Sequence, residues 1–111
     1  MLTSYTWIKE TLLQRLLPCI AALYHLSLEL ITFRDLFFVH YSTLPGAQNS
    51  LGLHRDGSLI SFNILLNPAT DFEGGGTFVA VYDRVISLQQ GEALLHSGQL
   101  LHAGNLLRVL L

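Results

Sequence analysis

Short apolar runs separated by turn residues make up most of the chain from residue 36 to its end. Aromatic and β-branched residues are common in these runs, and glycine, proline or asparagine stands between many of them, as is typical of strands joined by turns. In the run Ser58–Leu66, the polar residues Ser61 and Asn63 alternate with apolar neighbours, which is the period of two that indicates a strand. Many short strands of this kind predict a jelly-roll sandwich or barrel.

The expected strands cover residues 36–41, 51–56, 58–66, 77–81, 85–88, 92–96, 100–103 and 106–111. The last run ends with the chain, so we expect a jelly roll that is truncated at its C-terminus and a final strand that barely pairs. An incomplete chain is one interpretation of this short end.

The first 30 residues have a different pattern. Apolar residues recur every four positions between Ser4 and Leu17, which predicts an amphipathic helix. Pro18 suits the first position of a helix, where its missing N–H has no intrahelical partner, so we expect a second short helix from Cys19 to Leu26. We therefore expect a single domain over residues 1–111, with a helical N-terminal support in residues 1–30 and a jelly-roll core in residues 31–111.

Composition restricts the class of protein. A chain of 111 residues fits one small domain, and a content of 50% hydrophobic and 13% charged residues argues against disorder. The formal net charge is −2 and the sequence contains no cluster of lysine and arginine, so we expect no nucleic-acid partner.

No targeting or membrane segment is predicted. The longest early uncharged stretch, Leu16–Leu28, is too short to span a membrane and contains Pro18. No basic region leads into an apolar block, as it would in a signal peptide. The single cysteine, Cys19, cannot form an internal disulfide, and we expect it to be a small buried apolar residue, as fits a reducing compartment. The sequence does not fix the compartment, although these features favour the cytoplasm.

One short motif indicates chemistry. On a strand, residues i and i+2 point to the same face, so His54 and Asp56 converge while Arg55 points away. A third ligand from a distant strand would complete a 2-His-1-carboxylate group, which is typical of non-haem Fe(II) oxygenases. His-x-Asp alone is a weak signal, and two surface turn residues are the alternative. The metal-site interpretation is favoured because the pair precedes the strongest strand and further histidines occur near the C-terminus.

Longer segments extend this pattern. In order along the chain they read LHRDGS from Leu53, SFNILLN from Ser61, DFEGGGTF from Asp71 and GEALLHSGQLLHAG from Gly91. Together they resemble the catalytic domain of prolyl 4-hydroxylases and procollagen lysyl hydroxylases, from about residue 36 to residue 104. The resemblance implies a double-stranded β-helix that holds Fe(II) and 2-oxoglutarate, uses ascorbate as a reductant, and hydroxylates a prolyl or lysyl side chain of a peptide or protein substrate.

The same resemblance assigns site residues. It implies that His54 and Asp56 are the first two iron ligands. It also implies that the distal ligand is His102, the histidine before a small residue and a glycine. His96 is the competing choice for this ligand, although a pocket-wall or hydrogen-bonded core histidine is the better interpretation of it.

The co-substrate needs a cation for its far carboxylate, and arginine can grip a carboxylate with two hydrogen bonds. In the resembled family a basic residue follows the distal histidine after a turn with proline and glycine, a turn that this sequence lacks. Arg108 is the basic residue available there, either as that cation or as a solvated residue of the last strand. Tyr41 is expected either to face the oxoacid or to be a core aromatic. Asn63 and Thr77 either line the cavity or have ordinary structural roles.

Two other functions remain open. A catalytically impaired jelly-roll module could bind metal or peptide without turnover, because the turn before Arg108 is missing. A zinc hydrolase could use the same three ligands, but no acidic residue is evident beside them as a general base.

Overall fold

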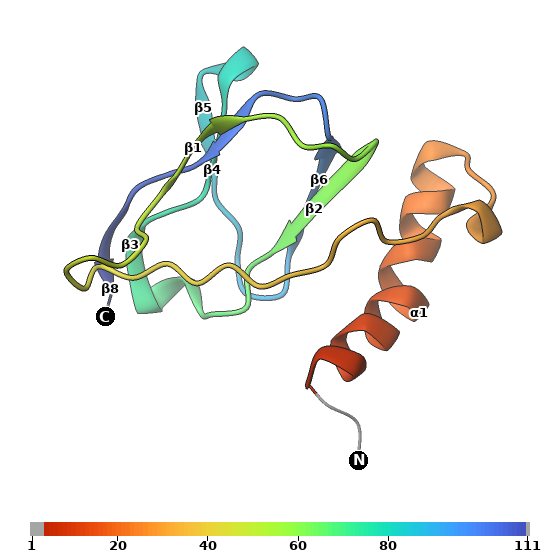
Figure 1. The fold of residues 1–111 in the computed structure, drawn as a ribbon, viewed down its shortest axis with the longest axis horizontal. Coiled ribbons are helices and arrows are strands. Elements are labelled where there is room, and N and C mark those ends of the chain that lie inside the picture. Colours follow the sequence, from red (N-terminus) through yellow and green to blue (C-terminus); the bar gives the residue numbers. More distant parts are fainter. Residues whose placement is uncertain (1–3, 111) are drawn as a thin grey trace. The chain divides into compact units, whose positions relative to one another are not determined.

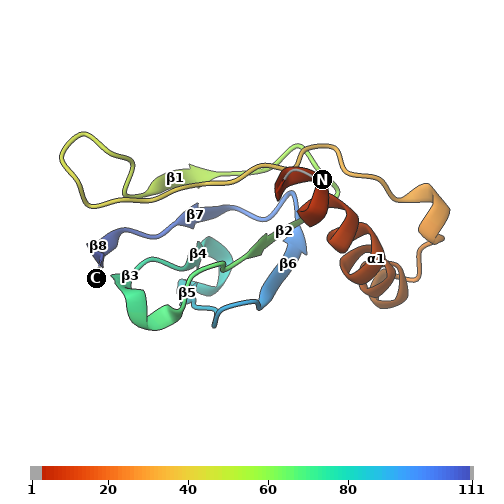
Figure 2. The same ribbon diagram turned by 90° about the horizontal axis from the view of Figure 1, so that it is seen from below.

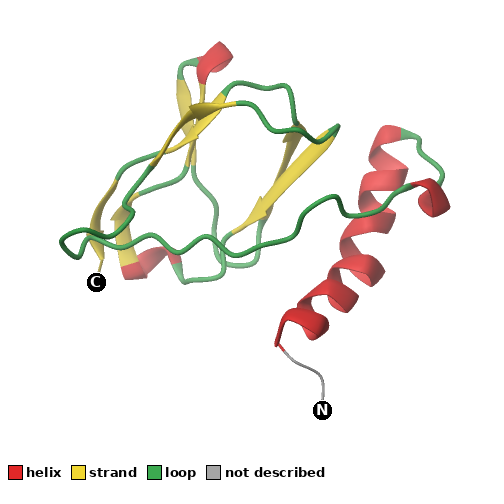
Figure 3. Ribbon diagram, in the orientation of Figure 1, coloured by secondary structure: helices red, strands yellow, loops and turns green. Residues whose placement is uncertain are grey.

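The structure is a computed structural model that describes residues 4–110. Backbone contacts divide the chain into two compact units, Met1–Phe38 and Val39–Leu111. The described part contains one α-helix, eight strands and three short 3-10 helices (Figure 1). All the strands lie in the second unit, and colouring by secondary structure makes this division plain (Figure 3). The expectation of a mainly β chain after a helical start is confirmed, whereas the single-domain assignment stays a prediction.

The first unit contains helix α1, Ser4–Tyr24, followed by the 3-10 helix Leu28–Leu30. The predicted division into two helices is wrong, because α1 continues through Pro18. A proline removes one hydrogen bond of the helix, and intact turns on both sides carry the helix past it. The helix ends at Tyr24. The next residue, His25, has a left-handed φ of 55°, and Leu26 N–H donates to the Ala21 carbonyl at 2.9 Å, as in a Schellman motif.

Cys19 is exposed, so its predicted burial is also wrong. In one continuous helix, Leu17 and Ile20 are three residues apart on the same face, and both are buried. Cys19 falls outside that face. No helix among residues 4–110 combines the length and the apolar character needed to cross a bilayer.

The second unit consists of antiparallel strands in three sheets (Figures 1 and 2). The four-stranded sheet has the order β1 (Leu51–His54), β7 (His102–Gly104), β4 (Thr77–Val79) and β5 (Arg84–Ile86). The two-stranded sheets pair β2 (Ile60–Ile64) with β6 (Ala93–Ser97), and β3 (Phe72–Gly74) with β8 (Leu107–Leu110). The 3-10 helices of this unit are Ala69–Asp71 and Ala80–Tyr82.

Cross-strand register identifies the inner faces. Asn63 Nδ2 on β2 donates to Thr77 Oγ1 on β4 at 3.3 Å, so these two side chains bridge the two sheets. On the β2–β6 sheet, Ser61 lies opposite His96, and this pair is on the face of Asn63, since side chains alternate along a strand. On the four-stranded sheet, the face of Thr77 also carries Val79, which is only 1% exposed, and its partner His102. Both sheets therefore direct a histidine into the space between them.

Residues 36–41 form no strand, contrary to prediction. Their aromatic and β-branched composition favours an extended chain, but a strand also needs an adjacent ladder. The first backbone hydrogen bond of this region comes one residue later, from Ser42 N–H to the Gln48 carbonyl within a loop.

Strand β3 was not predicted. It ends at Gly74, whose φ is 82°, and its three residues show no alternation that would reveal it. A Cβ on Gly74 would lie 2.5 Å from the Leu106 carbonyl oxygen and 2.9 Å from Arg108 N. Glycine thus lets the backbone of β3 approach that of β8, and pairing with β8 creates the strand.

Candidate metal centre

Two antiparallel strands bring the histidines of the motif together. His54 is the last residue of β1 and His102 is the first of β7, and the two lie directly opposite each other in the ladder. The strand register shifts between Leu51 and His54, and this shift brings His54 opposite His102. Residues directly opposite each other share a face, and the two ring centroids are 4.3 Å apart.

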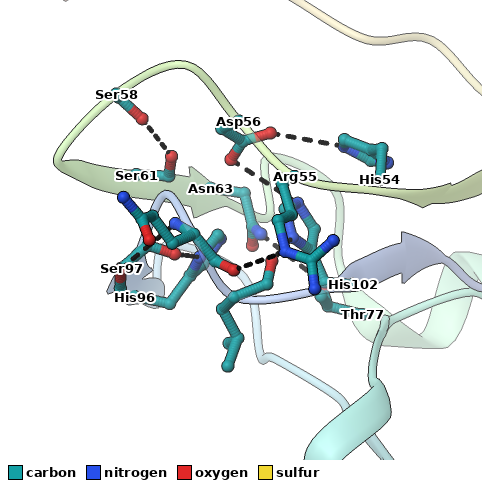
Figure 4. A network of polar contacts seen from close by, with 12 residues as sticks. His54, Arg55, Asp56, Ser58, Ser61, Asn63, Thr77, His96, Ser97 and His102 are labelled. Atoms are coloured by element: carbon teal, nitrogen blue, oxygen red, sulfur yellow. Dashed lines mark hydrogen bonds and ion pairs between the residues drawn. The ribbon is translucent and has the colours of Figure 1, made fainter.

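Asp56 completes the group from the loop after β1 (Figure 4). Its backbone N–H donates to the Gly98 carbonyl at 2.7 Å, which ties the loop to the turn before β7. Asp56 Oδ1 lies 3.4 Å from His54 Nε2, and Oδ2 lies 3.5 Å from His102 Nε2. One potential ligand atom from each residue lies within 4.8 Å of the other two. The structure thus brings together three sequence-predicted residues from two separated stretches.

Backbone carbonyls orient both imidazole rings. His54 Nδ1 lies 2.6 Å from the Gly52 carbonyl oxygen, and His102 Nδ1 lies 2.8 Å from that of Leu100. A carbonyl can only accept a hydrogen bond, so Nδ1 of each ring is the donor. In each ring the other nitrogen, Nε2, faces Asp56 and is the atom that could bind an ion. Outer hydrogen bonds of this kind commonly fix the rings of metal-binding histidines.

The three residues fit a divalent transition-metal ion. Nitrogen and carboxylate ligands bind such ions at about 2.0–2.2 Å, so neighbouring ligand atoms around one ion are roughly 3 Å apart. The separations of 3.4 and 3.5 Å are measured to the two oxygens of Asp56, and all three ligand atoms lie within 4.8 Å of one another, so the group must contract to hold one ion. The side chains of His54 and Asp56 are 32% and 28% exposed, whereas that of His102 is 9% exposed. One side of the group is therefore open to further ligands.

His96 lies outside this group. It is buried, its Nδ1 hydrogen-bonds to the Ser97 carbonyl at 2.8 Å, and its ring meets that of His102 edge-on at 4.5 Å between centroids. His96 also lines a cavity of about 280 Å³ together with apolar residues that include Val79 and Leu94. The structure thus places it in a pocket wall behind His102.

Tyr41 lies close to β7 although it belongs to no strand. A Cβ added to Gly104 would be 2.5 Å from the Tyr41 hydroxyl oxygen, so this glycine makes room for the hydroxyl group. Gly104 follows His102 by two residues and shares its face of β7. Burial raises the pKa of Tyr41 above its ordinary value of 10.0, so the hydroxyl stays protonated and can donate a hydrogen bond.

Arg108 is not brought to the three ligands. It is exposed on β8, and its neighbour Leu107 is buried, so the two side chains point to opposite faces of that strand. Its side chain forms no ion pair or hydrogen bond within residues 4–110. The role of Arg108 in binding 2-oxoglutarate stays a prediction.

The sequence interpretation missed the groups that hold the ligands in place. The carbonyls of Gly52 and Leu100 carry no side-chain signal, because any residue could supply them. Gly98 had a partial signal, since it is a glycine between two of the expected strands, 92–96 and 100–103. A Cβ on Gly98 would overlap the carbonyl of Ser58, so only glycine fits where this turn meets the loop that carries Asp56.

Part of this chain is similar to known enzymes. Multifunctional procollagen lysine hydroxylase and glycosyltransferase LH3, from Rattus norvegicus and from Homo sapiens, is 46% identical over 68 residues, 60% of this chain. This chain is similar to procollagen lysine hydroxylases. Procollagen-lysine,2-oxoglutarate 5-dioxygenase 1 from Mus musculus is 43% identical over 68 residues. No protein-family model matches the chain.

The match covers 9% of the length of each of these lysine hydroxylases. It supports a hydroxylase-like function for this chain. Of the two families that the sequence resembles, the match is to lysyl hydroxylases. Because the matched region is so small a part of these enzymes, their activities are not assigned to this chain.

Proposed function

We propose that this chain forms a double-stranded β-helix domain of an Fe(II)- and 2-oxoglutarate-dependent dioxygenase that hydroxylates a peptidyl lysyl or prolyl side chain. The observation that carries the proposal is the group of His54, Asp56 and His102, in which Nε2 of both rings faces Asp56, Nδ1 of both rings is held by a carbonyl, and one side of the group is open. The similarity to procollagen lysine hydroxylases favours a lysyl side chain as the target.

Each residue of the site has a defined task in this proposal. His54, Asp56 and His102 would hold the ion, and iron with 2-oxoglutarate and dioxygen supplies the oxidising power to hydroxylate a C–H bond. Tyr41 keeps its proton and offers a hydrogen bond on the face of β7 that carries His102. Ascorbate would serve as the reductant, as it does in the resembled family, and the substrate would be a peptide or protein.

An anaerobic titration tests the ion and the co-substrate together. Fe(II) and 2-oxoglutarate are added separately and then jointly, and the visible spectrum is recorded. A metal-to-ligand charge-transfer band should appear only when both are present. The variant Asp56→Ala should show no band, because it lacks the carboxylate ligand. Mass spectrometry of lysine- and proline-containing peptides, incubated with air, iron and 2-oxoglutarate, should then show one added oxygen atom.

A second function is favoured by the placement of Arg108. This arginine is exposed and makes no ion pair in the described part of the chain, so the co-substrate has no evident cation from β8. A domain that binds metal or peptide without turnover would have this arrangement. Metal binding without a charge-transfer band in the same titration would support this second function and overturn the first.

A further inference from the structure

Arg55 lies between two of the three candidate ligands, and the turn before β7 holds its side chain. Strand β1 ends at His54, so Arg55 begins the loop that carries Asp56. Its Nε donates to the Gln99 carbonyl at 3.1 Å, and Figure 4 shows the side chain crossing from the motif towards this turn. The guanidinium group is therefore held at one of its atoms beside the metal centre.

Gln99 stands between two residues whose carbonyls hold ligands of the metal centre. The residue before it accepts the backbone N–H of Asp56 at 2.7 Å, and the carbonyl of the residue after it lies 2.8 Å from His102 Nδ1. Consecutive Cα atoms are only about 3.8 Å apart. The anchored end of the Arg55 side chain is therefore close to two of the three ligands, and it carries the positive charge there.

The charge of Arg55 is available to a partner outside the chain. Arg55 is exposed, and the bond from Nε leaves its two terminal NH₂ groups without a hydrogen bond or ion pair in the described part of the chain. The neighbouring carboxylate does not neutralise it, because both oxygens of Asp56 face histidine rings. A guanidinium group with free terminal N–H donors can bind a carboxylate with two hydrogen bonds.

A peptide substrate has to approach this charge. The open side of the metal centre is that of His54 and Asp56, which are 32% and 28% exposed, whereas His102 is 9% exposed. An extended peptide advances about 3.3 Å per residue, so a residue within two positions of the target lies within roughly 7 Å of it. Charges at such a separation still interact through solvent, since the Debye length is about 8 Å at physiological ionic strength.

We infer that Arg55 recognises an aspartyl or glutamyl side chain of the peptide substrate, within two positions of the residue that is hydroxylated. This inference rests on the proposed function, because it needs a peptide whose target side chain reaches the ion. The guanidinium group attracts a carboxylate at that position and repels a lysine or arginine there, so it discriminates by both attraction and repulsion. Arg55 thereby selects among peptides and takes no part in the oxidation.

Three variants separate the charge of Arg55 from its anchoring role. Arg55→Gln removes the charge, but its amide nitrogen stands as many bonds from Cα as the arginine Nε, so it can still donate to the Gln99 carbonyl. Arg55→Lys keeps the charge. The matched control is Arg84→Gln, at an exposed arginine of β5, on the opposite edge of the sheet from β1. Circular dichroism and iron titration first show whether each variant is folded and loaded.

Peptides that differ at one residue supply the test. Each contains one target lysine, with aspartate, asparagine or arginine placed in turn at each of the two positions on either side of it. Fluorescence anisotropy measures the dissociation constant of each peptide with Fe(II) and 2-oxoglutarate present and oxygen absent, at low and at raised salt. Mass spectrometry measures the oxygen added to the same peptides in air.

At one or more of these positions, the unmodified protein should bind the aspartate peptide about 2- to 5-fold more tightly than the asparagine peptide, as expected of an exposed ion pair. It should bind the arginine peptide more weakly than either. This order should disappear in Arg55→Gln, persist in Arg55→Lys and Arg84→Gln, and diminish as salt is added. Iron affinity should be the same in all four proteins.

The inference is overturned if the unmodified protein binds the three peptides equally at every position, or if Arg55→Gln keeps the preference. Loss of iron binding in Arg55→Gln would also overturn it, because the residue would then serve only to hold the turn. If the peptides gain oxygen without regard to charge, the inference fails and the proposed function stands. If none gains oxygen, the proposed function fails, and the order of affinities still decides whether Arg55 recognises a carboxylate.

Discussion

His54 and His102 offer the same atom, Nε2, to the centre because both rings are held in the same way. Each donates its Nδ1 proton to a carbonyl two residues earlier in the chain. The ligand set is thus oriented before an ion binds, which reduces the ordering that binding requires. His96 differs, because it donates to the carbonyl of the following residue and lies outside the group.

Replacing His102 with alanine should abolish specific metal binding. This change removes a ligand, so the loss should exceed the roughly 10- to 100-fold that follows from losing a ring-orienting partner. The control is His96→Ala, which changes a buried neighbouring histidine and should keep the affinity. Calorimetry with Co(II) or anaerobic Fe(II) measures both. Loss of binding in the His96 variant alone would make His96 the distal ligand.

The raised pKa of Tyr41 predicts how the free energy of unfolding changes at alkaline pH. Its pKa is raised by burial, so the unfolded chain, with a tyrosine pKa near 10.0, ionises first as pH increases. The contribution of Tyr41 to stability is therefore complete below the unfolded pKa and is lost as pH rises through the folded pKa. Urea midpoints measured from neutral to alkaline pH should fall less steeply for Tyr41→Phe than for the unmodified protein. Tyr82→Phe, at a 70% exposed tyrosine, should follow the unmodified protein.

At this scale the sequence predicts which residues of the candidate site lie together but not what holds them in place. The expected strand over residues 51–56 ends at His54, so Asp56 reaches the site from the loop after β1 and not by the period-two geometry of a strand. The distal histidine needed the family resemblance, because no local rule selects His102 over His96. Hydrogen bonds to main-chain carbonyls depend on loop conformation, which the local sequence does not encode.

At the scale of elements, the junction between the loop after β1 and the turn before β7 determines where Asp56 lies. Asp56 N–H donates to the Gly98 carbonyl, and Gly98 N–H donates to the Leu59 carbonyl at 3.0 Å. Gly98 therefore joins the loop that carries Asp56 to the turn that precedes His102.

Gly98→Ala should destabilise the protein and weaken metal binding together. Its methyl group would overlap the Ser58 carbonyl, and overpacking of this kind costs about 1–3 kcal/mol. The matched control is Gly52→Ala on β1, where an added Cβ meets nothing within 4 Å and the carbonyl bonded to His54 is kept. Urea unfolding and metal titration of both variants check this. Equal stability of the two variants would contradict the assigned role of Gly98.

Elements were predicted well where the sequence alternates or turns are marked by glycine. Strand β2 lies on the alternating run Ser58–Leu66, β6 lies on an apolar run between two glycines, and their five register pairs follow without a break. Strand β3 and the unpaired segment 36–41 were misjudged because strand formation depends on a partner rather than on composition. Pro18 was misjudged because one missing hydrogen bond does not end a helix of 21 residues.

At the scale of the whole molecule, little apolar surface is completely buried. Within residues 4–110 the buried apolar side chains are Leu17, Ile20, Val79 and Leu107. Many large apolar side chains are exposed, including Leu59 at 87% and Phe37 at 74%. An ion that joins two strands should therefore contribute a large share of the stability of the second unit.

Metal addition should raise the thermal midpoint of the unmodified protein. At a free metal concentration 100 times the dissociation constant, binding to the folded state adds about 2.7 kcal/mol. Thermal scans with Co(II), and with a chelator instead, measure the shift. Asp56→Ala should show little shift, because its three-ligand group is broken. An equal shift in this variant would mean that the metal acts elsewhere on the chain.

Strand β1 is the first strand of its sheet and pairs with β7 on one side, and two of the three ligands lie at its end and just beyond it. Terminal strands open locally at less cost than the whole molecule unfolds. The lifetime of an ion held by the proposed centre should therefore be governed by local opening of this strand. Release and exchange of metal should proceed while the rest of the sheet stays intact.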